Sequence, residues 1–203
     1  MLDIFDRRKI RKEHWIFGTV ALFGLVGLLC SLILSIEKLH LLENPDSQLA
    51  CSINAILNCA SVMKTPEASL LGFPNSFIGL MAYPILITVA VIGFMGVRLP
   101  RPFMLLLQLG VTIEILFAYW LFFDSVFAIR VLCPFCLGVT FSSTMIFAAV
   151  TRYNILENNL YFAPKTQAWL EKFIAKDYDK VAVATWVVLM IALVLVKFPG
   201  IFA

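Results

Sequence analysis

The segment 131–141, VLCPFCLGVTF, places two cysteines at the start of a long apolar run. Proline is favoured in the first turn of a helix, because the N–H group that it lacks has no partner there. With Cys133 as the helix cap and Pro134 as the first helical residue, Cys136 falls in the first turn. Unpaired N–H groups and the positive end of the helix dipole favour a thiolate at that position. A CxxC motif alone indicates a redox pair, half of a zinc site or two buried structural cysteines.

The composition of the chain indicates a polytopic membrane protein. Hydrophobic residues make up 61% of the 203 residues and charged residues 14%, and the mean hydropathy is +0.92. Long apolar runs account for these values. Neither alternating apolar and polar residues nor a single apolar stripe along soluble helices does so. The net charge of +3 is modest, and the basic residues lie between the apolar runs. These basic residues therefore indicate how the protein is oriented in the membrane, and they do not indicate nucleic-acid binding.

Five apolar runs are long enough to cross a bilayer as helices. They are residues 15–36, 76–97, 103–123, 134–150 and 181–198. The sequence thus predicts an all-α polytopic membrane protein with a redox core of four helices and a fifth transmembrane helix. The expected divisions are a cytoplasmic leader (1–14), the core (15–150) with a long outer loop (37–75), a cytoplasmic connection (151–180), and the fifth helix with its tail (181–203). We also expect an amphipathic helix around Trp169, Leu170 and Phe173.

The basic residues predict which side of the membrane each loop faces. Twelve of the 16 Lys and Arg residues lie in the leader, in the turn after the second run or in 151–180. The other four are Lys38, Lys64, Arg130 and Lys197, which fall on the opposite side. Because positively charged loops stay in the cytoplasm, the sequence predicts a multi-pass protein of the inner (plasma) membrane with a cytoplasmic N-terminus. Four cysteines, Cys51, Cys59, Cys133 and Cys136, are then expected together at the outer face.

Two pairs of thiols on one face can pass electrons to each other or bind one metal ion. Cys51 and Cys59 would lie about 12 Å apart along a straight helix, too far for a disulfide. Their segment must bend or unwind if they are to bond, and a mobile loop suits a shuttle between an external partner and the fixed CxxC pair. A closed zinc site fits less well, because the loop pair is widely spaced and no ligand-spaced histidine accompanies it. We therefore favour a redox relay over a metal site or static disulfides.

Two residues inside the expected spans remain to be interpreted. Cys30 lies among Gly, Leu and Ser residues, and we interpret it as a small packing residue. Glu114 lies near the middle of the third run, and an ionisable residue there is a functional candidate by default. We favour the structural alternative, in which its carboxyl group is protonated and hydrogen-bonded inside the bundle.

The order of these motifs resembles that of the vitamin K epoxide reductase family, and most of all its stand-alone bacterial members. The motifs are Cys-x7-Cys in the first outer loop, PNSFIG (74–79) opening the second run and CPFC opening the fourth. The resemblance covers residues 15–150 and implies a four-helix bundle around a quinone, capped by the loop with the shuttle pair. It further implies that Cys136 reacts at the quinone, that Cys133 exchanges with Cys59, and that Cys51 faces the incoming protein.

The resemblance also implies a quinone site and a reaction. The family's asparagine donor to the quinone falls on Asn75, and Thr140 stands where the vertebrate enzymes have a tyrosine donor. The other residues expected at this site are Ile78, Tyr83 and Leu121, with Phe77, Phe117 and Phe122 as further candidates for the ring pocket. The quinone would be of the menaquinone, ubiquinone or vitamin K type.

The expected activity is that of a membrane quinone-linked thiol:disulfide oxidoreductase. It takes electrons from a reduced secreted or periplasmic thioredoxin-like thiol oxidase through Cys51 and Cys59, relays them to the CxxC pair and reduces a quinone to quinol. Because no thioredoxin-like domain follows the last run, we expect a separate protein to supply the electrons. No metal ion and no nucleic acid are expected. The alternative is a membrane binding or assembly protein with structural disulfides or a Cys-ligated metal.

Overall fold

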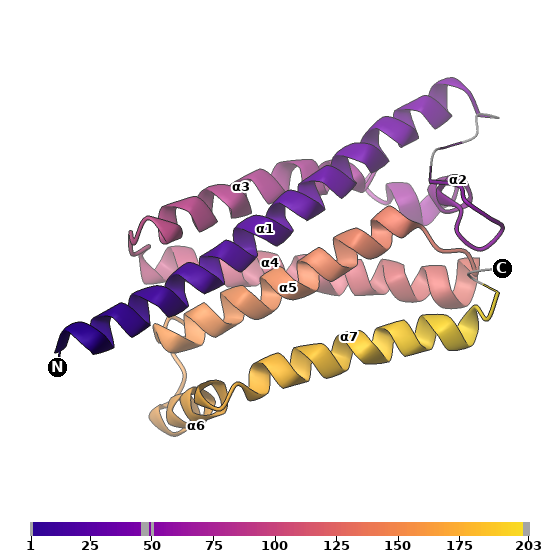
Figure 1. Cartoon of the computed structure of the whole chain (residues 1–203). Helices are drawn as coiled ribbons and strands as arrows, with labels where there is room; N and C mark the ends of the chain where they lie inside the picture. The colour runs from indigo at the N-terminus through magenta and orange to yellow at the C-terminus, as the bar shows by residue number, and fades with distance from the viewer. Residues whose placement is uncertain (1, 46–48, 50, 201–203) are drawn as a thin grey trace.

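The structure is a computed structural model, which describes residues 2–45, 49 and 51–200. Helices account for most of this part of the chain (Figure 1). Five of them are long and apolar enough to cross a membrane, in agreement with the sequence-based prediction. They are α1 (Leu2–Glu43), α3 (Ser76–Phe94), α4 (Arg101–Asp124), α5 (Pro134–Leu156) and α7 (Tyr178–Lys197). The all-α membrane fold predicted from the sequence is thereby confirmed.

Short elements connect the long helices at the two ends of the bundle. Segment 44–75, the cysteine loop, contains α2 (Cys59–Met63) and a single 3₁₀ turn, η1 (Pro66–Ser69). After α4 the chain continues as a π-helical turn, η2 (Ser125–Ile129). The expected amphipathic helix is present as α6 (Pro164–Ala175).

Two helices extend well beyond the C-terminal ends of their apolar runs. Helix α1 continues past residue 36 to Glu43, so the cysteine loop begins later than predicted, and α5 continues past residue 150 to Leu156. The segment 37–43, EKLHLLE, consists mainly of strong helix formers, which continue a helix beyond the apolar run. Hydropathy marks the part of a helix that is apolar, and not where the helix ends.

The core forms where α1 packs against α3 and α5, and α4 packs against α5. Close approach of α1 and α3 depends on glycine: a methyl group on Gly79 would overlap Ser31, and one on Gly27 would overlap the ring of Tyr83. Small residues are favoured at such contacts because they let helix backbones come close inside a membrane. The buried side chains at this contact include Phe17 and Val20 of α1 together with Tyr83.

Helix α7 lies outside this four-helix core, against α5 (Figure 1). None of its residues is buried, although its whole length is described. One side-chain contact to the core is a hydrogen bond from Trp186 Nε1 to the Tyr119 hydroxyl, 2.7 Å long. The four-helix core with an added fifth helix is thus as predicted.

Candidate active site

The four cysteines of the two expected pairs lie at one end of the bundle. Figure 1 shows α2 beside the start of α5, at the end opposite the N-terminus and α6. Cys51 and Cys59 form a disulfide, and their Cα atoms are 5.6 Å apart. The chain between them is not helical: it folds back so that Ser52 and Asn58 form an isolated β-bridge. This is the bend that a disulfide between two residues eight positions apart requires.

Backbone hydrogen bonds hold the disulfide against the CxxC motif. Asn58 N donates to Leu132 O over 2.9 Å, and Leu132 N donates to Ile56 O over 2.8 Å. These bonds join the segment just before Cys59 to the residue before Cys133. As a result, Cys133 Sγ lies 3.2 Å from Cys59 Sγ. The structure thus brings the two expected exchange partners into contact.

The start of α5 has the capped geometry that the sequence predicts. Cys133 is the N-cap, Pro134 follows it, and the Cys136 N–H group donates to Cys133 Sγ over 3.3 Å. A hydrogen bond from the Cys136 thiol lowers the pKa of Cys133, with further bonds from the N–H groups of Cys136 and Phe135, against the opposing effect of burial. We expected the helix N-terminus to stabilise a thiolate at Cys136. Instead its N–H groups bond to Cys133, because the side chain of a capping residue points back at the first turn.

The loop disulfide is covered in this conformation. Cys51 is 3% exposed and Cys59 is fully buried, in a cluster that also contains Leu41 and Leu49. The sequence-based expectation that Cys51 faces an incoming protein is therefore not met in this arrangement of the loop. A protein thiol can reach Cys51 only after apolar side chains above it have moved.

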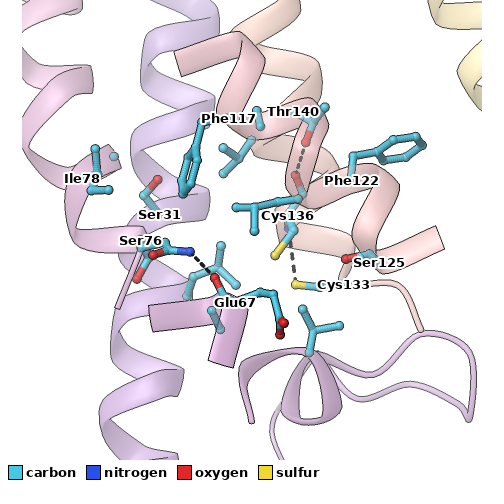
Figure 2. A pocket seen from close by; sticks show the side chains of 18 of the residues that line it. Ser31, Glu67, Ser76, Ile78, Phe117, Phe122, Ser125, Cys133, Cys136 and Thr140 are labelled. Carbon is cyan, nitrogen blue, oxygen red and sulfur yellow. Dashed lines mark hydrogen bonds between the residues drawn. The ribbon is translucent and has the colours of Figure 1, made fainter. Parts of the chain in front are cut away.

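A cavity of about 170 Å³ opens beside the CxxC pair. Its walls come from all five elements α1 to α5 with the turns η1 and η2, and both Cys133 and Cys136 line it (Figure 2). The residues that we expected at a quinone site all lie on its wall: Asn75, Ile78, Tyr83, Leu121 and Thr140. Of the further aromatic candidates, Phe117 and Phe122 line it and Phe77 does not. Quinone binding by these residues stays a prediction.

Two expected hydrogen-bond donors already have backbone partners. Asn75 Nδ2 donates to Glu67 O over 2.6 Å, and its Oδ1 accepts from Leu70 N over 3.3 Å. The side chain of Asn75 therefore holds η1 over the cavity, and only its second N–H hydrogen is left for a ligand. The Thr140 hydroxyl donates to Cys136 O over 3.0 Å, so its hydrogen is used within α5.

Polar residues that we did not predict also line the cavity. Ser143 is one of them, and it lies on the same face of α5 as Cys136, two turns further along. That spacing could have been read from the sequence. Lys38 and Asp124 line the cavity as well, and nothing in their sequence positions distinguishes them.

One of these groups indicates that the cavity is suited to a ligand with polar atoms. Asp124 Oδ2 is buried and has no hydrogen-bond partner among the residues that the structure describes. Buried polar atoms usually have a partner, so an unpaired oxygen at a cavity wall fits a hydroxyl group of a bound molecule. The apolar side chains around it, such as Ile78, Phe117 and Leu121, fit a ring and its substituents.

These features together define the class of protein. A membrane bundle that holds a disulfide against a free CxxC pair, beside an apolar cavity, is the arrangement of a membrane oxidoreductase. The family model of the vitamin K epoxide reductase family matches residues 19–151, and the chain belongs to that family. Its members are membrane oxidoreductases that use a quinone as electron partner. The match covers the four-helix core and ends before α6 and α7. No curated protein matches the chain.

Proposed function

We propose that the protein is a quinone-linked thiol:disulfide oxidoreductase that accepts electrons from a reduced thioredoxin-like protein and passes them to a membrane quinone. The observation that carries this proposal is the 3.2 Å contact between Cys59 Sγ of the loop disulfide and Cys133 Sγ of a CxxC pair that lines the cavity. A structural disulfide has no need of a free thiol in contact with it.

The membrane orientation follows from charge. Twelve of the 16 basic residues belong to segments at the end of the bundle that is far from the cysteines (Figure 1). Positively charged loops remain in the cytoplasm, so we place the N-terminus in the cytoplasm and the cysteines at the outer face of the inner membrane. Disulfide exchange with a secreted or periplasmic protein is possible only on that side.

The relay is a series of thiol–disulfide exchanges. A thiolate of the reduced partner attacks Cys51 and releases Cys59, and the partner's second thiol then releases Cys51 and completes the partner's disulfide. The Cys59 thiolate attacks Cys133 of an oxidised CxxC pair, and Cys136 leaves as a thiolate. Cys51 finally attacks Cys59 and releases Cys133. Two electrons have moved from the partner to the CxxC pair, and the Cys51–Cys59 disulfide has formed again.

The structure has the thiol states that follow this last exchange. Cys51 and Cys59 are bonded, and Cys133 and Cys136 are free. The lowered pKa of Cys133 makes it a good leaving group in the step that frees it. The dithiol then loses two electrons and two protons to the quinone, which becomes quinol, and the Cys133–Cys136 disulfide forms again.

The test uses the full-length protein in lipid nanodiscs with a reduced thioredoxin-like protein and a soluble ubiquinone analogue. Quinol formation is followed by absorbance. We expect Cys136→Ala to abolish it, whereas Cys30→Ala, which removes a free cysteine that does not line the cavity, retains it. Full quinol formation by Cys136→Ala would refute the proposal.

A further inference from the structure

Three polar side chains from three helices meet at the wall of the cavity. Ser143 Oγ of α5 lies 2.8 Å from Glu114 Oε1 of α4 and 3.2 Å from the Tyr83 hydroxyl of α3. All three residues line the cavity, and Ser143 and Tyr83 are 2% and 1% exposed. This group contains one titratable carboxyl, and the relay of thiols does not use it.

The position of the group relative to the thiols follows from α5. Ser143 follows Cys136 by two turns of the helix, about 10 Å along its axis. Thr140 lies between them on the same face, and its hydroxyl is bonded to Cys136 O. The Glu114 group therefore lies deeper in the membrane than the thiols, while η1 and Asn75 lie near the end of α1 that carries the cysteine loop. The protein therefore offers polar groups to a bound ligand at both ends of the cavity.

The hydrogen bonds of Ser143 are compatible with a protonated Glu114. A serine hydroxyl has a single hydrogen. Ser143 Oγ also lies 3.0 Å from Val139 O, which can only accept. If the serine hydrogen points to Val139, the 2.8 Å contact requires a hydrogen on Glu114.

The membrane environment also favours the protonated, neutral form of Glu114. Glu114 belongs to a membrane-spanning helix, and no lysine or arginine in the described part of the chain pairs with it. An unpaired ionised carboxylate at that depth is costly, whereas a neutral carboxylic acid with hydrogen-bond partners is not.

We propose that Glu114 is a neutral carboxylic acid that donates a proton to the quinone oxygen at the membrane-deep end of the cavity. Tyr83 and Ser143 hold its carboxyl group in place. When the dithiol is oxidised, Cys133 and Cys136 supply two electrons and release two protons. Glu114 gives its proton to the substrate and takes one of these two in return, so that the quinol carries two protons and Glu114 is again neutral. This inference rests on the proposed function.

The first experiment measures quinol formation by Glu114→Gln in the nanodisc assay. Glutamine keeps the size and a hydrogen-bond donor but cannot transfer a proton, so we expect the rate to fall by about 100-fold, as for the loss of a general acid. The rate of wild type should be slower in D₂O than in H₂O, and this isotope effect should change in the variant. Reduction of the Cys51–Cys59 disulfide by the thioredoxin-like protein without quinone should be unchanged. The matched control is Glu37→Gln, on α1 and outside the cavity lining.

The second experiment does not depend on activity. The infrared spectrum of the wild-type protein at neutral pH should contain the C=O band of a protonated carboxylic acid. Glu37→Gln should retain this band and Glu114→Gln should lack it. If Glu114→Gln does not fold, Ser143→Ala leaves the acid in place and should shift the band toward that of a carboxyl with fewer hydrogen bonds.

The outcomes separate the two proposals. Quinol formation by Glu114→Gln at the wild-type rate, or a wild-type spectrum without the band, overturns the role of Glu114. If wild type forms no quinol from the reduced partner, the proposed function fails, and the infrared band still decides whether Glu114 is neutral.

Discussion

Cys133 Sγ lies 3.2 Å from Cys59 Sγ, although 74 positions separate the two residues in the chain. The contact exists because the backbone of residues 56–58 is hydrogen-bonded to Leu132 on the N-terminal side of α5. The cysteine loop therefore presents Cys59 to Cys133, and not to Cys136. This selectivity leads to a direct test.

The triple variant Cys30→Ala/Cys51→Ser/Cys136→Ser should form a Cys59–Cys133 disulfide on mild oxidation, because the two remaining thiols are already in contact. Mass spectrometry of non-reduced peptides detects this bond. In the matched variant Cys30→Ala/Cys51→Ser/Cys133→Ser, the remaining pair is Cys59 and Cys136, and we expect several-fold less crosslinking. Equal crosslinking in both variants would show that the loop does not distinguish the two thiols.

Asn75→Ala should loosen η1, because it removes the hydrogen bonds from Nδ2 to Glu67 O and from Leu70 N to Oδ1. Two hydrogen bonds, one partly buried and one exposed, contribute about 1 to 3 kcal/mol in total. Hydrogen exchange of the amides in 67–70 should therefore become faster. Unchanged exchange in η1, together with a raised KM for quinone, would indicate that Asn75 acts only through the ligand.

Gly79→Ala should destabilise the bundle by about 1 to 3 kcal/mol, since the added methyl group overlaps Ser31 at the contact of α1 and α3. Gly110→Ala is the matched control: Gly110 lies within α4, and a methyl group there meets no atom within 4 Å. It should leave the stability unchanged or raise it by up to about 1 kcal/mol, because alanine is the better helix former. Thermal unfolding in detergent compares the two variants, and equal melting temperatures would count against the close approach of α1 and α3.

Lys38→Met should make the loop disulfide easier to reduce. Lys38 Nζ donates to Met63 O over 2.6 Å and so ties the end of α2 to α1. A hydrogen bond from a charged group contributes about 1.5 to 3 kcal/mol, and its loss favours opening of the loop. The measurement is the rate at which a small phosphine reduces Cys51–Cys59. Lys64→Met, which removes an exposed hydrogen bond to Pro45 O, should change this rate far less.

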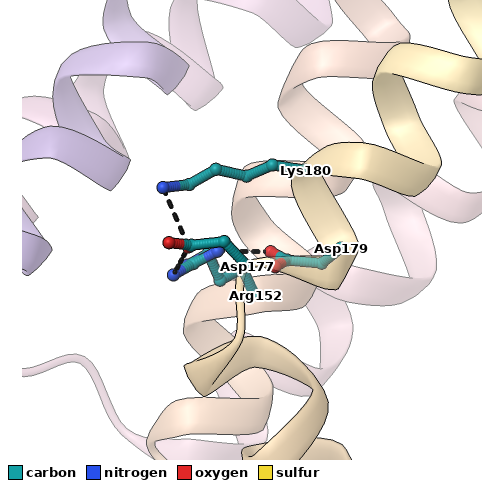
Figure 3. Close-up of polar contacts among 4 residues, drawn as sticks. All are labelled: Arg152, Asp177, Asp179 and Lys180. Carbon is teal, nitrogen blue, oxygen red and sulfur yellow. Dashed lines mark hydrogen bonds and ion pairs between the residues drawn. The ribbon is translucent and has the colours of Figure 1, made fainter.

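The attachment of α7 to the core should weaken in strong acid. Figure 3 shows Asp177 between Lys180 and Arg152, and Arg152 also pairs with Asp179. Hydrogen bonds from Lys180 and then Arg152 lower the pKa of Asp177 below its ordinary value of 3.8. A depressed folded-state pKa means that the ion pairs stabilise the attachment above about pH 3.8 and are lost as the pH falls through the lower folded-state value. An NMR titration of the Asp177 carboxyl should show this lowered pKa, and Arg152→Gln should raise it toward 3.8. An unchanged pKa in the variant would mean that Arg152 does not contribute.

The sequence by itself determined the number of membrane spans and the gathering of four cysteines at one end of the bundle. Both depend on quantities that can be summed along the chain, namely hydropathy and charge. It also predicted that Cys133 caps α5, because a proline in the first turn is a local signal. The ends of α1 and α5 were placed too early, since helix propensity carries them beyond their apolar runs.

Only the tertiary structure decided which groups meet. The contact of Cys133 with Cys59, the hold of Asn75 on η1 and the meeting of Glu114 with Ser143 each join side chains from different elements. Such contacts depend on how closely the helices approach each other and on how each helix is rotated about its axis. Glycines such as Gly79 allow the close approach, but they do not specify the rotation. For the same reason the helix N-terminus favours the thiolate of Cys133, although the local sequence pointed to Cys136. The direction of a side chain, and not its position in the chain, decides which N–H groups donate to it.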